Sequence, residues 1–330
     1  MRRRDFTIGL LLAVATQSVR AQGPPKQHRI AIITPAGPVA AISDTGPRAW
    51  PAFFDELRRL GDVEGQNLTI ERYSGEGRPE RYVDLAREVV NRNPDVIVAI
   101  TTPVAEAARA ANGAIPIVWI GVETIGVGLV TSLARPGGNI TGVNLYDYEI
   151  WGKRLQILKE AVPAASKVAF LLPRRTWENV YGQLLREISR RLEISLIGMP
   201  LDESTPSEYK HVFAKIAPER PDAIIVHDIG DLVPYRHLIV ELVEKSRLPA
   251  MYGWRDYVEA GGLMAYEADL GEARRRMADD VHEILNGAKP SDIPIYQATK
   301  FELVINLKAA ATIGLTIPPA ILARADEVIE

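Results

Sequence analysis

A single stretch divides this chain of 330 residues into two similar halves. It begins with the apolar run 118–120, which is typical of a strand buried on both faces of a parallel sheet, and it ends in the glycine-rich segment 135–142. On each side of it, short apolar runs alternate with segments whose apolar residues recur at helical spacing. Alternating strands and helices predict parallel sheets flanked by helices, so we expect two α/β lobes with a cleft between them.

The expected strands follow one another at regular intervals. In the tail we expect a short strand at 294–297 and then a helix from Phe301 to Ile313. The other expected strands are 28–33, 68–73, 95–100 and 115–120 in the first half, and 167–172, 194–199, 222–227, 249–252 and 262–266 in the second.

The composition is that of a soluble globular protein, with 25% charged residues and a net charge of -3. So small a net charge implies no polyanionic partner, and we expect no nucleic acid to bind. The chain contains no cysteine, which excludes disulfides and a lipid-modified cysteine as an anchor.

Residues 1–21 have the pattern of an export signal peptide. Residues 2–6 form a basic n-region that begins with three arginines, and the apolar run 8–15 is too short to span a bilayer, which needs about 20 residues. The arginines before Phe6 favour the twin-arginine (Tat) route, while an ordinary general-secretory (Sec) signal remains open. We therefore expect a mature protein that begins near Gln22, lies in the periplasm and does not span the membrane.

The sequence signatures of catalysis that we searched for are missing. The chain has no Gly-x-Ser-x-Gly nucleophile elbow, no phosphate-binding Gly-x-x-x-x-Gly-Lys and no His-Glu-x-x-His. Its 5 histidines are scattered without the spacing of metal ligands. We therefore expect neither an enzyme nor a bound metal or other cofactor.

Ligands of open parallel sheets bind beyond the carboxyl ends of the strands, so the loops at those ends supply the candidate residues. Thr101 and Thr102 begin a helix, whose free N–H groups favour a ligand carboxylate, although one threonine can instead cap the helix. Glu123 is placed to accept hydrogen bonds from a ligand ammonium group. The candidates in the first half are Thr34, Gly37, Thr101, Thr102, Val122 and Glu123.

In the second half, cations and aromatic rings occupy the corresponding loops. Arg174 or Arg175 offers a bidentate clamp to a carboxylate, and the pair His227 and Asp228 can donate and accept hydrogen bonds. Aromatic rings form the apolar walls of many small-molecule pockets, while a simple packing role for each ring remains open. The candidates in the second half are Arg174, Trp177, His227, Asp228, Tyr252 and Tyr266.

Five blocks of sequence, in the same order, resemble those of a broad family of bacterial substrate-binding proteins of ABC transporters, including its tryptophan- and tyrosine-binding branch. The resemblance covers essentially the whole chain after the export signal. The blocks are 63–67 (Val-Glu-Gly-Gln-Asn), 128–130 (Gly-Leu-Val), 135–142 (Arg-Pro-Gly-Gly-Asn-Ile-Thr-Gly), 261–264 (Gly-Gly-Leu-Met) and the tail 300–308 with 314–319.

The resemblance implies the α/β fold of type I periplasmic binding proteins, in which two lobes, each a parallel sheet flanked by helices, are joined by three crossovers that form a hinge. It places residues 22–143 and 265–296 in lobe 1, and residues 144–264 and 297–330 in lobe 2. It further implies a monomer that closes on a small carboxylate-bearing solute, such as an amino acid or an aromatic or other organic acid. The closed form would dock on a membrane permease driven by a separate ATPase.

Two cleft loops depart from the family's pattern. The family commonly has Gly-Asp-Pro-Val where this chain has 122–125 (Val-Glu-Thr-Ile), and Asn-Pro where it has Pro173-Arg174. Two alternative functions also remain open: a periplasmic sensory module for a receptor kinase or chemoreceptor, and an exported α/β enzyme. A transcription regulator of this fold is disfavoured, because an export signal stands where DNA-binding helices would be.

Overall fold

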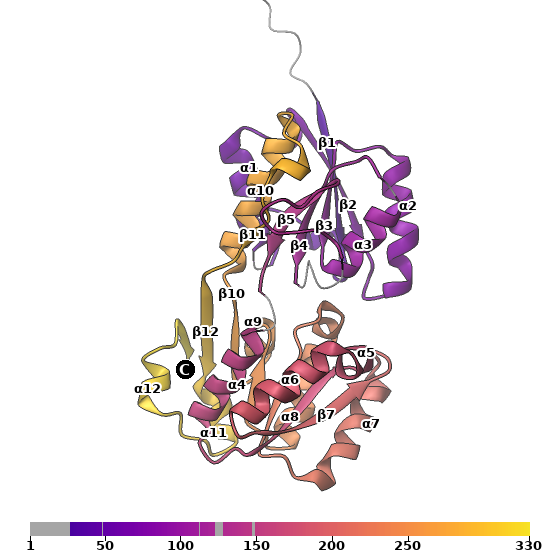
Figure 1. Cartoon of the computed structure of the whole chain (residues 1–330). Coiled ribbons are helices and arrows are strands. Elements are labelled where there is room, and N and C mark those ends of the chain that lie inside the picture. The colour runs from indigo at the N-terminus through magenta and orange to yellow at the C-terminus, as the bar shows by residue number, and fades with distance from the viewer. Residues whose placement is uncertain (1–26, 48, 112, 123–127, 147–148) are drawn as a thin grey trace, which may run out of the picture.

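The computed structural model describes residues 27–47, 49–111, 113–122, 128–146 and 149–330. Figure 1 shows them as two lobes, one above the other, each built on its own sheet. Lobe 1 comprises a six-stranded sheet with its helices, and lobe 2 comprises a seven-stranded sheet with its helices.

Lobe 1 is a parallel sheet covered by helices on both faces. Its strands are β1 (His28–Thr34), β2 (Leu68–Ser74), β3 (Val96–Ile100), β4 (Ile117–Gly121), β5 (Ile140–Asn144) and β11 (Tyr296–Gln297), in the spatial order β11–β5–β4–β3–β1–β2. Its helices are α1 (Trp50–Leu60), α2 (Tyr82–Asn91), α3 (Thr102–Ala111) and α10 (Leu270–Leu285). α1 and α10 pack together against one face of the sheet, and α2 and α3 against the other.

Lobe 2 repeats this arrangement with two strands reversed. Its strands are β6 (Lys167–Pro173), β7 (Ser195–Leu201), β8 (Ala223–Val226), β9 (Ala250–Tyr252), β10 (Met264–Ala268), β12 (Phe301–Asn306) and β13 (Glu327–Ile329), in the order β13–β12–β10–β9–β8–β6–β7. Its helices are α4 (Glu149–Ala161), α5 (Arg174–Glu178), α6 (Val180–Arg191), α7 (Pro206–Ile216), α8 (Arg236–Lys245), α9 (Arg255–Glu259), α11 (Leu307–Thr312) and α12 (Pro319–Leu322). β12 runs antiparallel to β10.

Short 3₁₀ helices lie in several of the connections. They are η1 (Val39–Ala41), η2 (Pro79–Arg81), η3 (Ala217–Glu219), η4 (Gly230–Tyr235) and η5 (Pro290–Asp292). η4 follows β8 and faces lobe 1, so it contributes to the gap between the lobes.

The continuous apolar strands exist because both faces of each sheet are covered. In β1, Ile30 and Ile32 contact the α1 and α10 side, whereas Ala31 and Ile33 contact the α2 and α3 side. Alternate residues of a strand point to opposite faces, so a strand between two helical layers must be apolar at every position. The nine strands predicted between residues 28 and 266 are confirmed to within two residues at each end.

The tail departs from its predicted structure. Phe301–Asn306 is a strand, β12, and the helix that follows is only Leu307–Thr312. Val304 and Ile305 are β-branched and buried, and β12 pairs with β10 and β13, which stabilises the extended form over a helix. The side-chain oxygen of Asn306 then caps α11 by accepting from the backbone N–H of Ala309.

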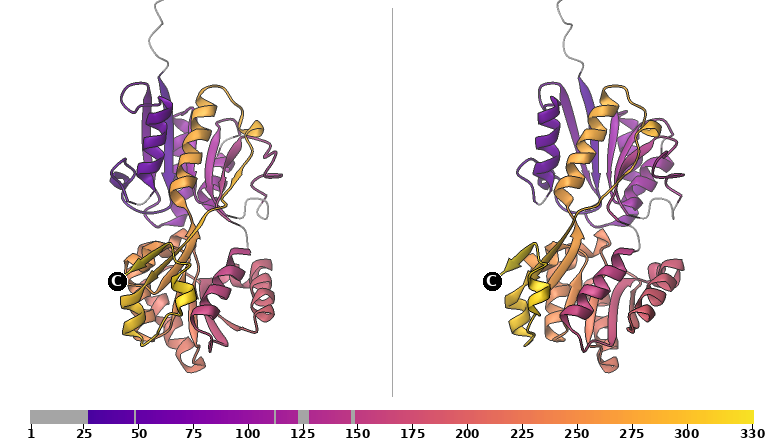
Figure 2. Two further views of the ribbon diagram at one scale, coloured as in Figure 1. Left: turned by 90° about the vertical axis from the view of Figure 1, so that its left-hand side faces the viewer. Right: turned by 60° about the vertical axis from the view of Figure 1, so that its left-hand side comes forward.

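The chain passes between the lobes three times, after β5, after β10 and after β11, and Figure 2 shows the crossings after β10 and β11 side by side. The predicted boundary at 264/265 assigns residues 265–268 to lobe 1, but β10 pairs with β9 and β12 in the lobe 2 sheet, so this crossing begins at Asp269. The other two predicted boundaries each cut one residue from a lobe 1 strand, because β5 includes Asn144 and β11 includes Gln297.

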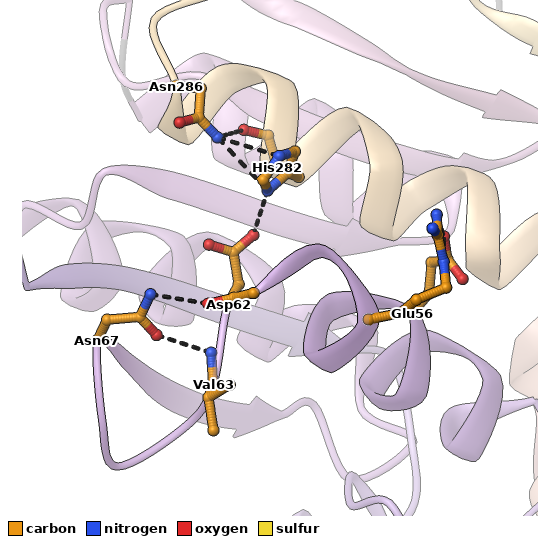
Figure 3. Close-up of polar contacts among 8 residues, drawn as sticks. Glu56, Asp62, Val63, Asn67, His282 and Asn286 are labelled. Atoms are coloured by element: carbon orange, nitrogen blue, oxygen red, sulfur yellow. Dashed lines mark hydrogen bonds and ion pairs between the residues drawn. The ribbon is translucent and has the colours of Figure 1, made fainter.

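Polar contacts fix α10 to lobe 1 on its return (Figure 3). Nδ1 of His282 lies 2.7 Å from Oδ2 of the buried Asp62, which follows α1. Asn67 shapes the turn after Asp62 by accepting a hydrogen bond from the N–H of Val63 at 2.7 Å. Helix α10 is therefore joined to a segment of lobe 1 that lies 220 residues earlier in the sequence.

Candidate functional site

The carboxyl ends of the strands in lobe 1 face those in lobe 2, and the lobes touch at one edge of the gap. The hydroxyl group of Tyr82 in lobe 1 donates to Oδ1 of Asp231 in lobe 2 at 3.1 Å. Beside this contact, a methyl group built on Gly230 would lie 3.5 Å from Cγ2 of Thr101 and 3.7 Å from Cγ of Pro35. These are ordinary van der Waals distances, so η4 lies directly against the lobe 1 loops.

The lobe 1 edge is strained at Thr101. This residue has φ 81°, which is unfavourable for a β-branched side chain and costs about 1–3 kcal/mol. Two backbone hydrogen bonds hold it in place: its N–H donates to the carbonyl of Ile120 at 2.8 Å, and its carbonyl accepts from Ala105 at 3.1 Å. Strain of this kind is most often found at functional sites, and Thr101 lies at the point where β3 meets the gap.

The predicted hydroxyl donors of lobe 1 already have acceptors within the lobe. Thr102 Oγ1 donates to the carbonyl of Val122 at 2.6 Å, and Thr34 Oγ1 donates to the carbonyl of Tyr73 at 3.3 Å. A hydroxyl group has a single hydrogen to donate, so neither side chain is free to donate to a ligand carboxylate. Gly37 has φ 87° and its carbonyl accepts from Ser74, so it forms the turn after β1. Glu123 lies outside the described residues.

The lobe 2 edge contains a buried ion pair that includes the predicted residue Asp228. Arg154 on α4 is fully buried, and its Nη1 donates to Oδ2 of Asp228 at 2.5 Å. Its other two nitrogens also donate, Nε to the carbonyl of Tyr266 at 2.9 Å and Nη2 to the carbonyl of Gly253 at 3.1 Å. The hydroxyl group of Tyr146 also donates to Asp228. Every nitrogen of the guanidinium therefore has an acceptor, which is the condition under which a buried ion pair is tolerated.

These contacts keep Asp228 ionised. Burial acts to raise the pKa of Asp228, but the positive charge of Arg154 outweighs it, so the pKa lies below its usual value. Sequence reasoning missed Arg154 and Tyr146. A signal for Arg154 was present, because it lies on the same helical face of α4 as Trp151, Leu155 and Leu158, where a charge needs a buried partner.

His227, the neighbour of Asp228, keeps an unused donor. Its Nδ1 accepts a hydrogen bond from the backbone N–H of Ile229 at 3.1 Å, which assigns the ring hydrogen to Nε2. Nε2 is buried and has no hydrogen-bond partner in the described part of the chain. Leaving such a group unpaired costs about 1–3 kcal/mol. Burial lowers the pKa of His227, so the ring is neutral near pH 7.

The other predicted residues of lobe 2 have partners within that lobe. Arg174 forms ion pairs with Asp202 and Glu178. The ring of Trp177 lies 4.6 Å from the guanidinium of Arg186. The prediction that Tyr252 lines the cleft needs correction, because its side chain is 1% exposed and stacks at 4.9 Å on Tyr257 in the core of lobe 2. The ring of Tyr266 stacks on that of Phe301 with 5.6 Å between the ring centroids, and the backbone carbonyl of Tyr266 accepts a hydrogen bond from Arg154.

A separate cavity of about 890 Å³ lies between the lobes, beside α1 and α9. Asp55 and Arg275 line it from lobe 1, and Arg236 and Arg255 from lobe 2. None of the described candidate residues lines this cavity, so it is distinct from the gap between the strand ends.

Within the described residues, no group of three or more acidic, histidine or cysteine side chains is arranged to hold a metal ion.

Residues 48–329 match the family model described as ABC transporter substrate binding protein. The chain belongs to this family. A relative from Clostridioides difficile strain R20291, named tyrosine-binding protein, is 24% identical over 261 residues, which are 78% of this chain and 74% of the relative.

Solved structures show the same fold. A conserved domain protein from Vibrio cholerae matches with a TM-score of 0.82 and 27% identity over 92% of this chain and 100% of its own. An ABC domain from Streptococcus pneumoniae in complex with L-Trp also gives 0.82, with 22% identity and the same coverage. A periplasmic binding protein from Burkholderia mallei gives 0.56, with 13% identity over 81% of this chain and 80% of its own. The predicted type I fold of this substrate-binding protein is therefore confirmed.

Proposed function

We propose that this protein binds an amino acid in the gap between its strand ends and delivers it, unmodified, to the membrane permease of an ABC importer. The family membership supports solute binding, and relatives named for tyrosine and complexed with L-Trp support an amino acid as the solute. The observation that carries the proposal is the opposition of two strand edges in lobes joined by three crossovers. A solute that contacts both edges binds the closed form better and shifts the population toward it.

The binding proposal is tested by a thermal-shift screen of the 20 amino acids, followed by titration calorimetry. A cognate amino acid at 100 times its Kd would stabilise the folded state by about 2.7 kcal/mol, which is readily visible in the melting temperature. X-ray scattering should show a smaller radius of gyration with the same compound, and mass spectrometry should recover it unchanged. If no amino acid shifts the melting temperature or contracts the molecule, the proposed ligand class is wrong.

We also propose that the protein works as a monomer in the periplasm, to which residues 1–21 direct it. Among the described residues, no helix is both long and apolar enough to cross a membrane. The export route is tested with Arg3→Lys and Arg4→Lys together. Retention of this variant inside the cell would identify the twin-arginine route, whereas normal export would identify the general-secretory route. Light scattering of the exported protein gives its oligomeric state.

A further inference from the structure

His227 keeps a buried hydrogen-bond donor without a partner in the described residues, at the carboxyl end of β8. Its ring lies 4.8 Å from the ring of Trp151 and 5.9 Å from that of Phe170, so its orientation is fixed. With Nδ1 used by the backbone of Ile229, the free Nε2–H is the only donor that the ring has left. The residue is 7% exposed, and it stands directly after β8, at the strand edge that faces lobe 1.

Helix α5 at the same edge carries two adjacent arginines with different surroundings. Arg174 is engaged by Asp202 and Glu178. Arg175 is exposed and has no ion pair or hydrogen bond in the described part of the chain. Its positive charge opposes the effect of burial on the pKa of Asp231 and of Tyr82 in lobe 1, and it adds to the effect of burial in lowering the pKa of His227. Strands β6 and β8 are paired in parallel with Leu171 opposite Val226, so Arg175 and His227 follow adjacent strand ends at the same edge of the sheet. Arg174 instead pairs with Asp202 in the loop after β7.

We infer that His227 and Arg175 form a carboxylate-binding subsite on lobe 2, an inference that rests on the proposed function and names its anchoring group. An ionised carboxylate only accepts hydrogen bonds, so it can accept from both a neutral N–H and a guanidinium. Its negative charge would also give Arg175 an ion-pair partner. Asp231 is the acidic side chain near Arg175, but it already accepts from Tyr82. The alternative anchor on lobe 1 is weaker, because the hydroxyl group of Thr102 is committed to Val122.

The test compares acids with the amines that lack only the carboxylate. The probes are L-tryptophan against tryptamine and L-tyrosine against tyramine, with indole-3-propionate as a carboxylate that has no amine. Wild-type protein should bind the acids more tightly than the amines. Arg175→Gln should weaken binding of the acids by about tenfold to a hundredfold and leave binding of the amines unchanged, because hydrogen bonds to charged groups contribute this much. Arg174→Gln is the matched control and should bind like wild type.

The role of His227 is tested with two variants that differ in the donor they keep. Asn in place of His227 retains an acceptor near Nδ1 but has no donor at the position of Nε2, whereas Gln can place its amide N–H there. His227→Asn should lose affinity for the acids, and His227→Gln should recover part of it. Thermal melting without ligand shows whether each variant is folded. Equal losses for acids and amines would show a merely structural role and overturn the inference.

The remaining outcomes separate this subsite from the proposed function. If wild type binds the amines as tightly as the acids, the carboxylate subsite is wrong, while solute binding stands. If indole-3-propionate binds in an Arg175-dependent manner but neither amino acid does, the subsite stands and the amino acid as ligand class is wrong. An effect of Arg174→Gln in place of Arg175→Gln would overturn the assignment of the arginine. Binding of none of the probes would overturn both proposals.

Discussion

Each lobe contains a buried aspartate, Asp228 in lobe 2 and Asp280 in lobe 1, and the pKa values of the two are shifted in opposite directions. Asp228 in lobe 2 is 5% exposed and is paired with the guanidinium of Arg154, which lowers its pKa against the effect of burial. Asp280 in lobe 1 lies on α10, is 1% exposed, and has no hydrogen-bond partner for its Oδ2 in the described residues. Burial raises its pKa to about 7, and the more distant Arg276 only partly opposes this.

This difference shows that burial alone does not decide the charge of a carboxyl group. A charge that has left water stays ionised where a fixed cation and hydrogen bonds replace the water, and it is neutralised where they do not. Asp231 is the intermediate case: its partner Tyr82 is a neutral hydroxyl group, and burial raises its pKa. The charged pair is at the gap and next to the hinge, whereas Asp280, with its raised pKa, is inside lobe 1.

The largest effect is expected from breaking the charged pair. Asp228→Ala leaves the guanidinium of Arg154 buried without a counter-ion, and it should lower the free energy of unfolding by about 3–5 kcal/mol. Adding Arg154→Met should restore much of this loss, because the uncompensated charge is then gone. Urea unfolding of the single and double variants measures both quantities. A loss below about 1 kcal/mol for Asp228→Ala would mean that the pair is not a buried, mutually dependent unit.

A smaller and pH-dependent effect is expected at Asp280. Its pKa of about 7 in the folded state exceeds the ordinary value of 3.8, so its contribution to stability is full below about pH 4 and is lost as the pH rises through 7. Asp280→Asn should therefore match wild type at pH 4 and exceed it at pH 8, by on the order of 2–4 kcal/mol. The exposed Asp292→Asn serves as the control. A variant that is no more stable than wild type at pH 8 would contradict an unpaired Asp280.

The smallest effect is expected at Tyr82, the hydroxyl partner of Asp231. Tyr82→Phe removes the hydrogen bond that joins the lobes, and it should shift the ligand-free protein toward open forms by about 1 kcal/mol. X-ray scattering without ligand should then give a larger radius of gyration. Tyr73→Phe is a suitable control, because its hydroxyl group bonds to Glu71 within lobe 1. An unchanged scattering profile for Tyr82→Phe would mean that this contact does not hold the lobes together.

Most of the fold could be predicted from the sequence, because strands covered on both faces leave continuous apolar runs. Three strands were missed: β5, which lies in the stretch interpreted as a glycine-rich exit, Phe301–Asn306 and β13. Phe301–Asn306 was predicted as a helix because its pairing with β10 and β13 is not visible in its own sequence. Pairing partners of this kind leave no local signal, and the β-branched Val304 and Ile305 were the only hint.

The candidate site was predicted less completely, because the sequence gives the position of a side chain but not its partners. The loops that hold Thr101 and His227 were identified correctly as lying at the strand ends. Nothing in the sequence indicates that Thr102 donates to Val122 or that Asp228 is held by Arg154. Arg174 and Arg175 could not be told apart either, since neighbouring residues of a helix point about 100° apart and only the packing decides which one faces the gap.

The route of the chain through the two lobes also governs the order in which they can form. Asp62 belongs to the part of lobe 1 made first, yet its partner His282 is synthesised 220 residues later, after five of the seven strands of lobe 2. During synthesis, the face of lobe 1 that α10 later covers therefore stays exposed until α10 has been made. Most strands of lobe 2, in contrast, are contiguous in the sequence, so they can pair soon after they are made. A chaperone that holds this nascent chain has one exposed apolar face to protect, the surface of β3, β4 and β5 that α10 later covers.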